Sequence, residues 1–158
     1  MEELKVPTRA ITVDIYTSDG AVLHGCMFHV ETRYETGTAE DLACELNDQR
    51  SFLPLRSDDS EAGSMLLNKQ HILRIHIPGL TADMLLHDET DETRRSVPCS
   101  VWLDDGSHLE GRPIVVTPDS RSRLVDKFNS APEFLIFISD AGVDFIHTSH
   151  VLRVQQHN

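Results

Sequence analysis

The sequence has few cysteines, little positive charge and no long apolar run, and each shortage excludes a class of protein. No stretch of about 18 apolar residues occurs, so we expect no transmembrane helix. The first ten residues lack the basic start and the apolar core of a secretory signal. Three cysteines without C-x-x-C spacing provide neither a disulfide framework nor a zinc site, and they suit a reducing compartment. We therefore expect a cytoplasmic protein that makes no membrane contact.

The charge balance is acidic, and familiar catalytic motifs are missing. The 158 residues include 26 Asp and Glu but only 14 Lys and Arg, which gives a formal net charge of -12. A field of this sign repels phosphate backbones and argues against binding to nucleic acid. No G-x-S-x-G, H-E-x-x-H, phosphate-loop or dinucleotide motif occurs. We expect a protein that is not an enzyme and that needs no cofactor.

Four blocks of the sequence recur in the same order, which predicts an internal duplication. The matching pairs are Ser18–Gly25 with Asp104–Gly111, Asp41–Asn47 with Asp126–Asn129, Ser51–Leu55 with Glu133–Phe137, and Lys69–Ile75 with Thr148–Val154. We expect a first repeat over residues 8–77 and a second over 96–156. The acidic stretch 78–95 between them is typical of a solvated linker.

Each repeat predicts five strands with one short helix between the second and the third. Alternating apolar and polar residues indicate the strands, which we expect at 10–16, 22–30, 52–56, 64–67 and 72–77, and again at 97–103, 108–116, 134–139, 143–147 and 151–155. The helices are expected at 38–46 and about 120–128.

Glycine and asparagine occupy matching places in the two repeats. Gly20 and Gly106 follow Asp in hairpin turns that require a positive φ. Gly25 and Gly111 lie inside the second strands, where glycine often marks a bulge or a tight bend. Asn47 and Asn129 are expected to end the helices, because asparagine tolerates the left-handed conformation. The alternative is that these asparagines form a polar binding edge.

This pattern resembles the Sm-like fold, a member of the SH3-like class of small barrels. The resemblance rests on Asp19-Gly20 with Leu23 and Gly25, on Asn47 ahead of Phe52-Leu53-Pro54-Leu55, and on the turn Asn68–Ile72, with their counterparts in the second repeat. It implies a mainly β protein made of two tandem five-stranded barrels. Two features depart from the family: Sm-like proteins place a helix before the first strand, and their last turn carries an Arg-Gly pair that helps to hold RNA.

Histidines offer the most suggestive candidate site. His147 and His150 flank a tight turn, and His71 takes the place of His150 in the first repeat. Two imidazoles three residues apart can chelate a transition metal if the turn brings them together. The simpler interpretation, which we favour, is that His71 and His150 cap the turns by bonding backbone groups.

Three functions remain open from the sequence. The favoured one is a non-catalytic interaction or assembly module, which pairs with a protein partner or with itself as a dimer or a higher ring. The first alternative is an RNA-binding protein, as the Sm-like resemblance implies. The second is a metal or small-ligand sensor that uses the turn histidines.

Overall fold

The computed structural model describes residues 8–30, 38–59, 61, 63–80, 97–114 and 123–157. In this part the protein is mainly β, with one antiparallel sheet of ten strands and two short α-helices. The first five strands are β1 (Thr8–Thr17), β2 (Val22–Val30), β3 (Phe52–Ser57), β4 (Ser64–Asn68) and β5 (Ile72–Ile77). The other five are β6 (Cys99–Leu103), β7 (His108–Ile114), β8 (Phe134–Ser139), β9 (Gly142–His147) and β10 (Val151–Gln156).

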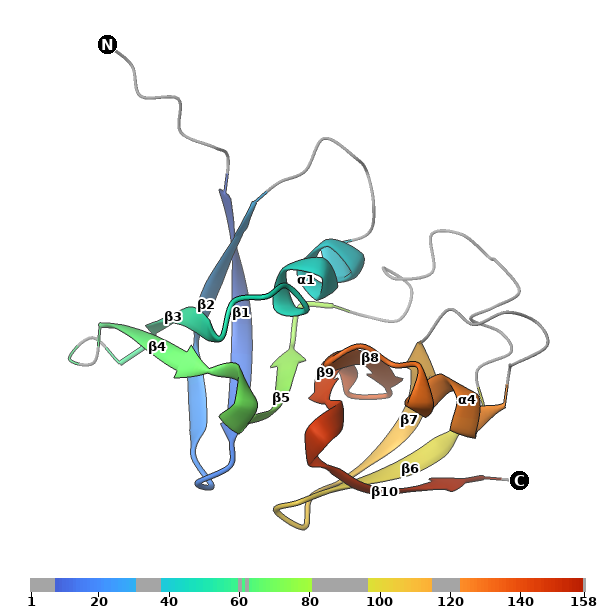
Figure 1. Cartoon of the computed structure of the whole chain (residues 1–158). Helices are drawn as coiled ribbons and strands as arrows, with labels where there is room; N and C mark the ends of the chain where they lie inside the picture. The colour runs from blue at the N-terminus through green and yellow to red at the C-terminus, as the bar shows by residue number, and fades with distance from the viewer. Residues whose placement is uncertain are drawn as a thin grey trace.

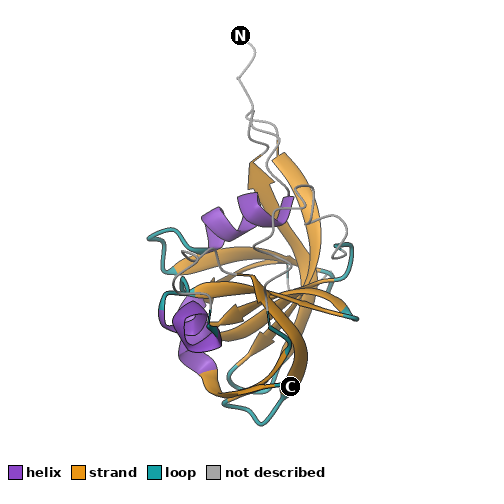
Figure 2. Cartoon of the chain, turned by 90° about the vertical axis from the view of Figure 1, so that its right-hand side faces the viewer, coloured by secondary structure: helices purple, strands orange, loops and turns teal. Residues whose placement is uncertain are grey.

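Short helices and turns connect the strands at matching places. Helix α1 (Thr38–Leu46) lies between β2 and β3, and α4 (Leu124–Asn129) lies between β7 and β8. The 3-10 turns η1 (Lys69–His71) and η3 (Thr148–His150) precede β5 and β10. Figure 2 shows α1 across the upper part of the molecule and α4 at its lower left.

Strand order shows how the two halves of the chain, residues 8–80 and 97–157, are joined. The sheet runs β10-β6-β7-β8-β9-β5-β1-β2-β3-β4. The first half contributes β5-β1-β2-β3-β4, and the second contributes the same order as β10-β6-β7-β8-β9. Pairing of β5 with β9 connects them, so β4 and β10 stand at opposite ends of the sheet (Figure 1).

Pairing registers agree closely between the halves. Tyr16 lies opposite Arg74 in β1 and β5, and Trp102 lies opposite Arg153 in β6 and β10, with a register shift directly after each pair. In both pairs the guanidinium stacks over the aromatic ring, with the Cζ atom 3.7 Å from the ring centroid of Tyr16 and 4.4 Å from that of Trp102. Cross-strand contacts therefore repeat down to individual side chains.

Glycines at two kinds of position shape each half. Gly20 and Gly106 have φ values of +88° and +86° in the hairpin turns, where other residues would be strained. Gly25 and Gly111 instead allow a close crossing of strands. A Cβ at Gly25 would lie 2.2 Å from the carbonyl oxygen of Arg56, and one at Gly111 would lie 2.1 Å from that of Ile138.

The mainly β class predicted from the sequence is confirmed, and most expected strands lie within two residues of the observed ones. Strand β6 begins at Cys99 rather than at residue 97, because Pro98 has no N–H for the ladder. Residues 81–95 of the expected linker and residues 115–122 around the start of the second helix lie outside the described residues.

The hydrophobic core crosses the boundary between the halves. The larger buried cluster joins residues of α1, β1, β3 and β5 to Phe134, Val143 and Phe145 of the second half. The smaller cluster places Leu73 of β5 with Phe137 and Ile146. Each cluster therefore lies mainly in one half and is completed by a few residues of the other. Within the described residues, no helix has the length and apolar character needed to cross a membrane.

Candidate functional site

His147 caps the turn η3 from a buried position. Its Nδ1 accepts a hydrogen bond from the backbone N–H of Ser149 over 3.2 Å, and its Nε2 lies 3.0 Å from Glu133 Oε1. Asn68 does the same in η1, where its side-chain oxygen accepts from the N–H of Gln70. Burial lowers the pKa of His147, although the hydrogen bond to Glu133 opposes this shift. The capping residues are thus Asn68 and His147, not His71 and His150 as the sequence suggested.

The other two histidines lie at the ends of these turns. His150 packs edge-on against His147 with 5.1 Å between ring centroids, and its Nδ1 is 2.8 Å from Asp104 Oδ2. Its Nε2 lies 2.5 Å from the carbonyl oxygen of Gln70, which belongs to the first half. His71 contacts Ser18 instead, at 3.3 Å. Among the described residues, no group of three or more His, Cys, Asp or Glu side chains is placed to hold a metal ion.

Asn47 connects the first half to the second. Its Nδ2 donates to the carbonyl oxygen of Phe134 over 3.1 Å, and its Oδ1 accepts from the N–H of Phe134 over 2.7 Å. The side-chain amide therefore binds this residue as a neighbouring strand would. The expected left-handed conformation at Asn47 and Asn129 is absent, because no non-glycine residue in the described part has a positive φ.

A buried ion pair holds β5 against β9. An Nη1 of Arg74 lies 2.8 Å from Oδ1 of Asp144, whose side chain is almost fully buried. His76 Nδ1 lies 3.3 Å from the same carboxylate oxygen. We call this contact between β5, α1 and the strands β8 and β9 the junction. It combines a strand ladder, the Asn47 amide, an ion pair and a shared apolar cluster.

Several residues at the ends of the sheet are exposed, although their counterparts in the other half are buried in the junction. Leu66 of β4 is 70% exposed, whereas Phe145, at the same ladder position of β9, is fully buried. Phe52, which begins β3, is 51% exposed, whereas Phe134 at the start of β8 is buried. Leu152 of β10 is 66% exposed, and its counterpart in β5 is the buried Leu73.

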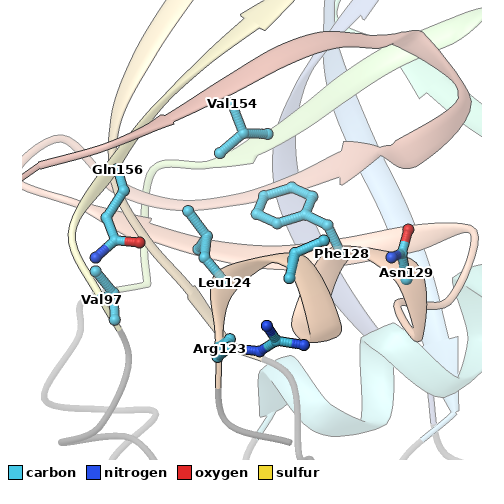
Figure 3. Close-up of a pocket in the computed structure, with 8 residues that line it drawn as sticks. Val97, Arg123, Leu124, Phe128, Asn129, Val154 and Gln156 are labelled. Atoms are coloured by element: carbon cyan, nitrogen blue, oxygen red, sulfur yellow. The ribbon is translucent and has the colours of Figure 1, made fainter.

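A pocket of about 850 Å³ lies between α4 and β10. Leu124, Phe128 and Val154 point into it, and Arg123, Val125, Asn129, Gln156 and Val97 complete its lining (Figure 3). We call it the α4–β10 pocket. Of the lining residues, Val125 is 54% exposed. The corresponding place in the first half, between α1 and β5, belongs to the junction and is covered by the second half.

Sequence reasoning did not identify the apolar residues at these two ends as exposed, and Phe52 entered it only as part of the Sm-like pattern. Phe52, Leu66, Val125 and Leu152 sit in ordinary strand and helix patterns, so nothing local separates them from core residues. The one available signal was the duplication itself, because it pairs each of them with a residue in the other half. The three cysteines are free thiols, and burial raises the pKa of Cys99 to about 11.

Comparison of the chain with protein-family models, with curated proteins and with solved structures found no match.

Proposed function

We propose that the chain is a tandem of two Sm-like barrel repeats and that it serves as a non-catalytic assembly module. Its binding elements are the two end strands, β4 and β10, which pair with strands of a protein partner. One observation carries the proposal: β5 and β9 pair with each other at the junction, while the corresponding strands of the opposite halves, β10 and β4, end the sheet.

Strand edges favour this kind of association for a physical reason. An end strand presents a row of backbone N–H and C=O groups that a further strand can satisfy, and proteins use this in β-strand addition. Many proteins blunt such edges with charged side chains or proline. Strand β4, Ser64–Asn68, contains neither, and its central residue Leu66 is largely exposed. This supports an edge that binds a partner.

Light scattering coupled to size exclusion, with absorbance recorded at 260 and 280 nm, tests the proposal. We expect a defined species larger than the 17.8 kDa chain and free of nucleic acid. Because the chain carries a net charge of -12, association between copies should strengthen with added salt, which screens their repulsion.

A matched pair of variants shows whether an edge strand is responsible. Leu66→Lys places a charge on β4, whereas Phe28→Lys changes an exposed residue in β2, a strand paired on both sides. Loss of association in the first variant alone supports the proposal. A strict monomer with no co-purifying protein contradicts it, and excess absorbance at 260 nm would favour RNA binding instead.

A further inference from the structure

We infer that the α4–β10 pocket receives Phe52 and Leu66 of a second copy of this chain, so that copies associate head to tail. This inference rests on the proposed function and names its partner. It also assigns a ligand to the pocket: the start of β3 and the middle of β4 from the neighbouring molecule. The argument comes from the junction, which shows the same surfaces already in contact within one chain.

Six of the eight residues that line the pocket correspond to residues on one side of the junction. The helix residues of each pair lie the same number of positions before β8 in the second half as before β3 in the first. The strand residues of each pair occupy the same ladder position in β10 and in β5. The pairs are Leu124 with Leu42, Val125 with Ala43, Phe128 with Leu46, Asn129 with Asn47, Val154 with Ile75, and Gln156 with Ile77. In the junction, Leu42, Leu46, Ile75 and Ile77 are buried in one cluster with Phe134 and Phe145.

The residues that fill that place in the junction also have counterparts at the other end of the sheet. Phe52 corresponds to Phe134, because each lies opposite the residue that caps the following turn. Leu66 corresponds to Phe145, since each lies two positions further along the same ladder. Both Phe52 and Leu66 are at least half exposed. The β4 end of the sheet therefore presents two protruding apolar side chains, and the opposite end presents the α4–β10 pocket.

Exposed apolar surface is concentrated at these two ends. Six large hydrophobic side chains in the described part are exposed, and four of them are Phe52, Leu66, Val125 and Leu152. The remaining two, Val22 and Phe28, lie in β2. A soluble monomer gains nothing from exposing such residues together, whereas an interface buries them. Head-to-tail contact covers all four at once, because the counterpart of Leu152, Leu73, is buried in the second apolar cluster of the junction.

Asn129 sets the alignment of the second copy. Asn47 binds both backbone groups of Phe134, and the equivalent bonds would run from Asn129 to the N–H and C=O of Phe52 in the neighbouring molecule. Asn129 is exposed, and its side chain has no hydrogen-bond partner among the described residues. The register of β5 with β9 then places Val154 opposite Leu66 and Arg153 opposite Leu67.

At two positions the corresponding surfaces carry different residues, and both differences make this interface weaker than the junction. Met65 stands where the junction has Asp144, so Arg153 finds no carboxylate across the interface. Gln156 likewise replaces the buried Ile77. Association between chains is thus reversible, whereas the junction is permanent. Because the two surfaces differ, the contact is heterologous and builds either a closed ring or an open filament.

Complementation between two blocked full-length variants tests the inference. Leu66→Lys blocks the β4 end, and Val125→Lys blocks the pocket; both residues are exposed, so folding should be preserved. We expect each variant alone to sediment as a monomer and an equimolar mixture to form a 1:1 heterodimer through the remaining intact ends. Phe28→Lys should associate as the wild type does. Unchanged circular dichroism and urea unfolding confirm that the blocked variants fold.

Asn129→Ala provides a second, finer measurement. Loss of two hydrogen bonds should raise the Kd for association about tenfold. It should leave the stability of the monomer unchanged, whereas Asn47→Ala should lower that stability.

Failure of the inference can be told apart from failure of the proposed function. If the wild type associates but Val125→Lys associates equally well, the pocket is not the receptor, although the assembly function stands. If both blocked variants are monomeric and their mixture remains monomeric, the contact is not head to tail. If the wild type is monomeric but another protein co-purifies with it, the partner is not a second copy of this chain. If the wild type is monomeric and no other protein co-purifies with it, the inference and the proposed assembly function are both wrong.

Discussion

The buried ion pair of the junction gives a quantitative prediction for Asp144→Asn. Asp144 is almost fully buried, and its carboxylate lies 2.8 Å from the guanidinium of Arg74, which is itself mostly covered. Two unit charges about 4 Å apart attract by about 4 kcal/mol at an effective dielectric constant of about 20. The amide of asparagine still accepts a hydrogen bond, so part of this attraction remains. We expect the free energy of unfolding to fall by about 3 kcal/mol.

Urea unfolding at neutral pH measures this loss. With a slope of about 2 kcal/mol per molar urea, the midpoint should fall by about 1.5 M. The matched control is Asp126→Asn, which removes the same charge from an ion pair with the exposed Arg123. There the loss should stay below about 1 kcal/mol, because water screens exposed pairs. Equal losses in the two variants would refute the reasoning, since burial would then contribute nothing to the strength of the pair.

Three further predictions concern stability. Gly111→Ala should cost about 2–3 kcal/mol by calorimetry, because its Cβ would lie 2.1 Å from the Ile138 oxygen, whereas Gly79→Ala, with open space around it, should cost nothing. Because the pKa of His147 is lowered by burial, the unfolded chain takes up its proton first, so the stability of the wild type relative to His147→Asn should fall as the pH drops below the ordinary value of 6.5. A pH-independent difference would contradict this. Lys69→Met removes a buried ammonium that binds Asp48, and the loss, about 2 kcal/mol at pH 7, should shrink below pH 3.8. The reason is that hydrogen bonds from Lys69 and Arg50 outweigh burial and lower the pKa of Asp48, so its contribution is lost only as the carboxylate is protonated. An undiminished loss at acid pH would contradict that assignment.

Local sequence rules were sufficient for the strands and hairpin turns. The Asp-Gly pairs place Gly20 and Gly106 in turns, and the alternation of apolar and polar residues indicates β1 and β6. Both features could be predicted because turn formation and strand pleating depend on residues that are close in sequence. The capping histidine was misassigned by the same kind of reasoning. His147 precedes η3 and His150 is its last residue, and only their three-dimensional surroundings show that His147 is the one that accepts from the Ser149 N–H.

Burial at the sheet ends could not be predicted from local sequence. Phe52 and Phe134 both begin a third strand in similar contexts, yet one is half exposed and the other is covered. The difference arises because α1 and β5 of the first half pack over Phe134, while the described residues include no equivalent partner for Phe52. The role of Asn47 is also tertiary, since its partner lies 87 residues away.

The shared apolar cluster has a consequence for how this chain could be divided. Phe134, Val143 and Phe145 complete a core whose other members all come from before residue 81. A polypeptide ending at residue 80 would therefore expose Ile75 and Ile77, and one beginning at residue 97 would expose the phenylalanines that cover them. Each fragment carries the surface that the other lacks, together with one strand of the β5·β9 ladder. Produced separately and mixed, the two pieces should reconstitute one sheet.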